Sequence, residues 1–167
     1  MYKLNYNFVT LFGIGNIKVA PGTFGSIFAC LILFILFHVL NLNNYLILVF
    51  LILITIFAFV SINIYLKNSV NKDPKEVVID EFVGQSIPII LYEFFHADRS
   101  NSLTEALQIY LWFFLLFRLF DGLKPFPIDY VDKKYKNSFG ILFDDILAGV
   151  YVVICLVLFM IGKTFFL

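Results

Sequence analysis

The segment YLILVFLILITIFAFVSINIYL, Tyr45–Leu66, decides the fold class of this 167-residue chain, because its 22 residues carry no charge. A helix that crosses a membrane needs about 20 consecutive, mostly apolar residues. The rest of the chain agrees, since 61% of all residues are hydrophobic and 14% are charged, against roughly 45–50% and 25% in soluble domains. The net charge of +0 also lacks the basic excess of a nucleic-acid-binding protein. We therefore expect one membrane-embedded domain over residues 1–167.

Four further apolar stretches lie on either side of this segment: Ile27–Leu40, Phe82–Phe95, Leu103–Phe120 and Ile146–Gly162. The stretch Phe82–Phe95 is short and contains Pro88 and Glu93, so as a spanning helix it would tilt little and thin the bilayer. The pattern predicts an all-α, polytopic helical bundle with about five membrane segments, the third of them short or tilted.

The distribution of basic residues favours an N-terminus in the cytoplasm. If all five stretches cross the membrane in that orientation, ten of the twelve Lys and Arg residues lie on the cytoplasmic side, and only Arg99 and Lys163 lie on the other. Cytoplasmic loops of membrane proteins carry such an excess of Lys and Arg. The sequence therefore predicts that the N-terminus is cytoplasmic and that the C-terminus is on the opposite side.

The same orientation places every polar, Gly-rich or acid-rich cluster of the chain on the cytoplasmic face. These clusters are APGTFGS (Ala20–Ser26), IDEFVGQ (Ile79–Gln85), FRLFDGLKPFP (Phe117–Pro127) and FDDILAG (Phe143–Gly149). The orientation was inferred from the distribution of Lys and Arg and not from these clusters. That all four clusters lie on one face therefore predicts a functional site there.

Paired acids stand at the beginning of two of the apolar segments, Asp80-Glu81 before one and Asp144-Asp145 before the other. In each segment a glycine follows one of the acids by four residues, Gly84 and Gly149, which places acid and glycine on the same helix face. Glycine lets two helix backbones approach closely in a membrane. We expect the acids of these two helices to converge in a carboxylate cluster; helix capping is the structural alternative.

Three charged residues follow at intervals of three at the end of the fourth stretch: Arg118, Asp121 and Lys124. Arg118 has apolar residues on both sides, and an ionisable residue near hydrocarbon depth is costly and commonly functional. An ion pair between Arg118 and Asp121, with the guanidinium reaching for the headgroups, is the structural alternative.

The cluster before the first apolar stretch contains two glycines and two hydroxyl residues, and its candidate residues are Pro21, Gly22, Thr23, Gly25 and Ser26. Backbone N–H groups at the start of a helix can hold an anion such as phosphate. The alternative is a Pro-Gly turn followed by a Ser26 helix cap.

The five acids near this face are candidate ligands of a cation: Asp80, Glu81, Asp121, Asp144 and Asp145. Two like charges 4 Å apart repel by about 4 kcal/mol even at an effective dielectric of 20, so such a cluster needs protons or a metal ion. Oxygen ligands favour Mg²⁺ over zinc, and His38 and His96 belong to the opposite side. Carboxylates, a hard cation, Arg118 and Lys124 together indicate phosphoryl chemistry. Attack by water and a phospho-aspartyl intermediate both remain open.

The four clusters, in this order and spacing, resemble phosphatidylglycerophosphatase A, and the shared motifs run from Gly13 to Gly149. The resemblance implies a Mg²⁺-dependent phosphatase of the bacterial cytoplasmic (inner) membrane that hydrolyses phosphatidylglycerophosphate, a phospholipid substrate in the bilayer, to phosphatidylglycerol and phosphate. It further implies that the five acids hold the metal and water, that Arg118 and Lys124 bind the phosphate, and that Pro21–Ser26 match the family's N-terminal loop. Neither the roles of individual acids nor the oligomeric state follow from it.

Two other functions use similar residues. A CDP-alcohol phosphotransferase also carries acidic motifs in a membrane, but its DGxxAR run is missing because Leu123-Lys124-Pro125 follow Asp121-Gly122. A non-enzymatic cation-binding or transport protein would need acids deep in the bilayer, whereas these acids gather at one interface.

Overall fold

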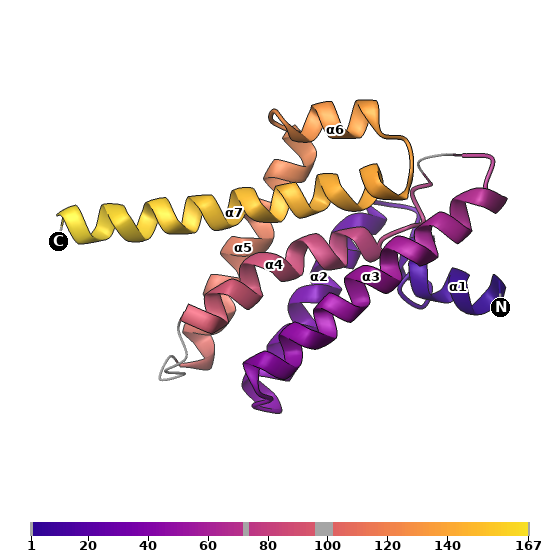
Figure 1. Cartoon of the computed structure of the whole chain (residues 1–167). Coiled ribbons are helices and arrows are strands. Elements are labelled where there is room, and N and C mark those ends of the chain that lie inside the picture. Colours follow the sequence, from indigo (N-terminus) through magenta and orange to yellow (C-terminus); the bar gives the residue numbers. More distant parts are fainter. Residues whose placement is uncertain (1, 72–73, 96–101, 167) are drawn as a thin grey trace.

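The computed structural model describes residues 2–71, 74–95 and 102–166, and every regular element within those ranges is a helix (Figure 1). Four stretches are long and apolar enough to cross a membrane. They are α2 (Pro21–Phe34) with its π-helical continuation η2 (Ile35–Val39), α3 (Asn44–Asn68), α5 (Leu103–Leu123) and α7 (Ser138–Phe166). The predicted all-α membrane bundle is thereby confirmed. His96 and Arg99 lie outside the described residues, and the side chain of Lys163 is not described.

The third predicted segment forms α4 (Ile79–Phe95), a helix of 17 residues with Pro88 inside it. At 1.5 Å per residue it is about 25 Å long, shorter than the other four. It packs against α2, α3, α5 and α7, and Figure 1 shows it in the middle of the bundle. Because α4 is enclosed by other helices, most of its polar side chains are buried, among them Asp80, Gln85 and Glu93.

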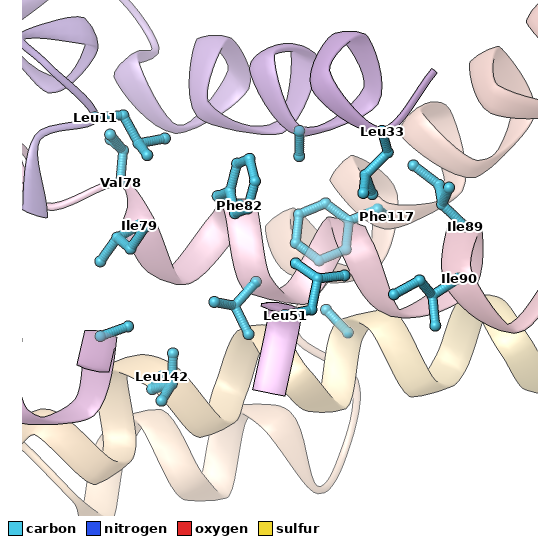
Figure 2. Packing of buried hydrophobic residues seen from close by; sticks show 14 of the residues in the cluster. Leu11, Leu33, Leu51, Val78, Ile79, Phe82, Ile89, Ile90, Phe117 and Leu142 are labelled. Carbon is cyan, nitrogen blue, oxygen red and sulfur yellow. The ribbon is translucent and has the colours of Figure 1, made fainter. Parts of the chain in front are cut away.

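Apolar side chains on several faces of α4 form the centre of the core (Figure 2). Ile79, Phe82, Ile89 and Ile90 of α4 are all buried. They share the cluster with side chains of the surrounding helices, which include Leu33, Leu51, Phe117 and Leu142. Burial on all sides explains why the sequence of α4 reads as a nearly continuous apolar run instead of a single apolar stripe.

The predicted close approach between α4 and α7 is present at their two glycines. A Cβ atom added to Gly84 would stand 2.5 Å from the backbone oxygen of Asp145, and one added to Gly149 would collide with the backbone oxygen of Gly84. No side chain larger than hydrogen fits at either position without moving a helix. This contact brings the N-terminal turns of α4 and α7, and hence their acids, together.

Two predicted helix boundaries were wrong. The first spanning helix begins at Pro21 instead of Ile27, and the last begins at Ser138 instead of Ile146. Hydropathy misses these turns because they are polar, yet Pro21 suits the first position of a helix and the added turn of α7 is packed inside the bundle. The proposed Pro-Gly turn before the first helix is therefore absent.

Three short helices had no counterpart in the sequence prediction: α1 (Tyr2–Val9), η1 (Ile14–Asn16) and α6 (Ile128–Lys134). Helix α1 packs on α3 and α6 packs on α7, as Figure 1 shows. Helix α6 carries charged residues over the N-terminal turns of α7, next to the acids.

Candidate active site

A cavity of about 260 Å³ lies where the four polar clusters meet. Its walls come from the start of α2, the segment before α4, the first turn of α4, the end of α5, α6 and the first turns of α7. The lining residues are Ala20, Pro21, Gly22, Pro74, Lys75, Val77, Asp80, Glu81, Arg118, Asp121, Lys124, Asp132, Ile141, Asp144 and Asp145. Clusters that are up to about 120 residues apart in sequence thus form one site.

Three acids form the centre of this cavity, and we call Asp80, Glu81 and Asp145 the acid triad. One carboxylate oxygen from each lies within 4.8 Å of the others. Asp80 is 7% exposed and Asp145 is 4% exposed. Each member of the triad also has one buried oxygen with no hydrogen-bond partner among the described residues.

Buried carboxylate oxygens without partners are costly, and placing three of them together adds mutual repulsion. A divalent cation removes both costs at once. An all-oxygen donor set is the kind that Mg²⁺ binds in proteins, so the residues that are present fit a magnesium ion.

The other two predicted acids, Asp121 and Asp144, reach the same cavity but contact basic residues. Arg118 Nη1 lies 3.0 Å from Asp121 Oδ2, and Lys124 Nζ lies 2.8 Å from Asp144 Oδ2. Asp121 is also close enough to Glu81 and Asp145 for their negative charges to interact. The structure therefore brings all five acids together but divides them into a triad and two ion-paired residues.

Lys124 ends α5 and links two helices. Its Nζ contacts Asp144 of α7 and also Asp132 of α6, at 3.2 Å. Partial burial alone would lower the pKa of Lys124, but the hydrogen bond and charge of Asp144, assisted by Asp132, outweigh it and raise that pKa. These two contacts favour the charged form of Lys124 at the rim of the cavity.

The start of α2 contacts the arginine. Arg118 Nη1 donates to Ser26 Oγ at 3.5 Å, and Ser26 Oγ donates to the backbone oxygen of Gly22 at 3.0 Å. A Cβ atom on Gly22 would collide with the Glu81 carboxylate, so the absence of a side chain there lets Glu81 reach the cavity. The first turn of α2 is thus part of the site.

Three residues of the predicted N-terminal cradle do not line the cavity: Thr23, Gly25 and Ser26. Ser26 is fully buried and contacts the site through Arg118. A Cβ atom on Gly25 would stand 3.0 Å from the backbone oxygen of Val78. Gly25 thus permits close packing of α2 against the segment before α4. The structure shows no contact of Thr23 with the cavity.

Sequence reasoning missed three residues at or near the site. Asp132 pairs with Lys124, and Lys75 lines the cavity without an ion pair to any described residue. Gln85 is fully buried one turn beyond Glu81, and neither polar atom of its side chain has a described partner. Gln85 lies inside the IDEFVGQ cluster, so its spacing of four from Glu81 was the available signal.

Fold and site together define a class: an all-helical protein with membrane-spanning helices and, at one end, an acid-rich cavity with basic side chains suited to a phosphate group. Comparison with known proteins identifies the family. The model of the phosphatidylglycerophosphatase A family matches residues 7–160, and the chain belongs to that family.

Three curated relatives resemble the chain over most of its length. A phosphatidylglycerophosphatase A of Haemophilus influenzae is 37% identical over 86% of this chain and 80% of its own. A phosphatidylglycerophosphatase A of Escherichia coli is 31% identical over 83% of this chain and 73% of its own. A putative phosphatidylinositol-3-phosphatase of Bacteroides thetaiotaomicron is 33% identical, over 85% and 84% respectively. No solved structure matches the chain.

Proposed function

We propose that this protein hydrolyses the terminal phosphomonoester of phosphatidylglycerophosphate, releasing phosphatidylglycerol and inorganic phosphate. The observation that carries the proposal is the acid triad beside Arg118 and Lys124 in one cavity. Two relatives named phosphatidylglycerophosphatase A, at 37% and 31% identity, support the choice of substrate.

Asp80, Glu81 and Asp145 are the residues that would hold Mg²⁺. When bound, the ion supplies Lewis-acid polarisation of the phosphoryl group and neutralises its charge. Arg118 offers a planar guanidinium that can contact two phosphate oxygens, and its contacts with Ser26 and Asp121 hold it in place. Lys124 and Lys75 add positive charge at the rim of the cavity.

We assign the orientation of the attacking water to Asp121, because it lies beside the triad and is fixed by Arg118. The water oxygen forms a bond to phosphorus, and the bond between phosphorus and the glycerol oxygen breaks. Asp121 accepts a proton from the water and then gives that proton to the departing glycerol oxygen, which leaves as the alcohol.

The position of the cavity suits a lipid substrate. It lies at the ends of helices that are able to span a membrane, so a lipid phosphate can enter it while the acyl chains stay in the bilayer. We propose that this end faces the cytoplasm, that the N-terminus is cytoplasmic, and that the chain is a multi-pass protein of the bacterial inner membrane. The excess of Lys and Arg on that side supports the orientation.

Phosphatidylinositol 3-phosphate is a second candidate substrate, because one relative at 33% identity is named as its putative phosphatase. Both lipids present a phosphomonoester at headgroup height. They differ in the alcohol that leaves, glycerol in one and inositol in the other.

The test is phosphate release by the purified protein in detergent micelles that contain either lipid, with Mg²⁺ or with EDTA. We expect release from phosphatidylglycerophosphate that stops with EDTA and returns with added Mg²⁺. If phosphate is released faster from phosphatidylinositol 3-phosphate than from phosphatidylglycerophosphate, the former is the preferred substrate and the proposal is wrong about the lipid. Undiminished release in EDTA would refute the metal-assisted mechanism.

A further inference from the structure

A second hollow, which we call the apolar groove, lies between α3, α4 and α7 and has a volume of about 340 Å³. Five residues of α3 and five of α4 face it at helical spacing, and one residue comes from α7. They are Leu48, Leu51, Ile52, Thr55 and Ile56, then Val83, Ser86, Ile87, Ile90 and Leu91, and finally Ile146. The mechanism proposed above does not use any of them.

The walls of the groove offer no free hydrogen-bond donor to a ligand. Its two hydroxyl residues each donate to the backbone of their own helix, Ser86 to Phe82 at 2.6 Å and Thr55 to Leu51 at 2.8 Å. The other lining residues are aliphatic. A molecule that fills this groove is therefore hydrocarbon where it touches the protein.

The groove begins beside the acid triad. Val83 follows Asp80 by three residues on the same side of α4, and Ile146 directly follows Asp145 on α7. From Val83 to Leu91 the groove extends about 12 Å along α4, at 1.5 Å per residue. Half of a bilayer hydrocarbon core of about 30 Å is about 15 Å, so the groove covers most of the depth of one leaflet.

We propose that the apolar groove binds one acyl chain of the lipid whose phosphate occupies the acid-lined cavity. This inference rests on the proposed function, because it assigns head and tail of one substrate to two adjoining hollows. It predicts that the protein distinguishes lipid phosphates by their chains. Bulk bilayer lipid is the alternative occupant, and it would give no such selectivity.

The first test fills the groove near the cavity with Thr55→Phe, and its matched control is Val49→Phe. Valine has nearly the shape of threonine, and Val49 is an exposed residue of the same helix outside the groove. Phosphate release is measured with dioleoyl and with dihexanoyl phosphatidylglycerophosphate in the same micelles. Thr55→Phe should lower kcat/KM for the dioleoyl lipid at least about tenfold. The phenyl ring would displace part of the acyl chain from the groove, and each methylene group that is no longer buried weakens the binding of the lipid. The kcat/KM of Thr55→Phe for the dihexanoyl lipid should stay near the wild-type value. The kcat/KM of Val49→Phe should stay near the wild-type value for both lipids.

A second pair of variants tests the end of the groove that lies away from the cavity. This pair keeps the proposal testable if Thr55→Phe does not fold. Leu48→Trp should impair only the dioleoyl lipid, and Leu46→Trp, an exposed position outside the groove, should impair neither. The proposal fails if both filling variants behave like their controls, or if they slow the two lipids equally. If the wild-type protein releases phosphate from neither lipid, the proposed function fails instead.

Discussion

Helix α4 buries two kinds of acid, one at each end. Glu93 is 1% exposed and is well partnered: its Oε1 accepts from Tyr110 at 3.1 Å and lies 3.1 Å from His38 Nε2, and its backbone oxygen accepts from Asn44 at 2.8 Å. Asp80 is 7% exposed, but its Oδ1 has no described partner. One oxygen each of Glu81 and Asp145 lies within 4.8 Å of an oxygen of Asp80.

The partners of a buried carboxylate indicate its role. A buried acid whose oxygens are satisfied by its own chain joins helices, here η2, α3, α4 and α5, and contributes to stability. A buried acid that faces other acids without partners lowers stability unless a cation binds there, and this is the arrangement expected of a metal ligand. Burial alone does not separate the two cases; the partners do.

The largest expected effect tests this contrast directly, with Asp80→Asn against Glu93→Gln. Asp80→Asn should lower kcat/KM at least about 100-fold, because it removes a proposed metal ligand. It should leave the free energy of unfolding without Mg²⁺ equal or higher, since repulsion in the triad decreases. Glu93→Gln should do the reverse and lower the free energy of unfolding by about 1–3 kcal/mol, with kcat/KM nearly unchanged. Enzyme kinetics and denaturant unfolding in detergent measure both.

Asp129→Asn is the control for the loss of one acid at this end of the protein. Asp129 lies on α6, pairs with Lys133 at 2.8 Å and does not line the cavity, so its variant should remain active. If Asp80→Asn destabilises the protein as much as Glu93→Gln does, the distinction between the two kinds of acid is wrong.

The next largest effect concerns Arg118. Arg118→Lys keeps the charge but loses the planar fork that can bind two phosphate oxygens, so kcat should fall about 10- to 100-fold. The contacts with Ser26 and Asp121 should weaken at the same time. Steady-state kinetics measure this effect. If Arg118→Lys keeps a nearly normal kcat, Arg118 does not bind the phosphate and only anchors the helix near the headgroups.

A smaller effect tests whether the triad exists because α4 and α7 touch. Gly84→Ala places a methyl group against the backbone of Asp145 and should destabilise the protein by about 1–3 kcal/mol. Activity should fall as the acids separate. Gly122→Ala is the matched control, because no atom lies within 4 Å of its added Cβ. Equal stability of both variants would show that the two helices are not held by this contact.

The smallest effect is a pH dependence at the edge of the site. Burial alone would raise the pKa of Asp132, but Lys136 and Lys124 outweigh it and hold that pKa below its ordinary value. A lowered folded-state pKa means that Asp132 contributes stability above about pH 4, its unfolded value. That contribution disappears as the pH falls through the lower folded-state pKa.

The contribution of Asp132 is expected to stay below about 1 kcal/mol, because its ion pairs are partly exposed. Asp132→Asn should therefore lower Tm slightly at pH 7, and the gap to the wild type should close below about pH 4. A gap that widens in acid would contradict the lowered pKa. Thermal unfolding of both proteins at a series of pH values measures this difference in Tm.

Much of this architecture follows from the sequence alone. A charge-free run as long as Tyr45–Leu66 has no stable place except a membrane or a large core, so composition determined the fold class. Spacing predicted a close approach of α4 and α7, because an acid and a glycine four residues apart share one helix face. The four polar clusters predicted a shared site, and the cavity contains residues from each of them.

Which acids find a partner on another helix depends on how the helices pack in three dimensions. Spacing along a helix states which face a residue occupies, but not which side chain of another helix meets it. The acid triad, the contacts of Lys124 with Asp132 and Asp144, and the contact of Glu93 with His38 all depend on distances between helices. The pair of Arg118 and Asp121 lies within α5, and its spacing of three was visible in the sequence. Those distances are set by packing around α4, whose neighbours come from nearly the whole length of the chain.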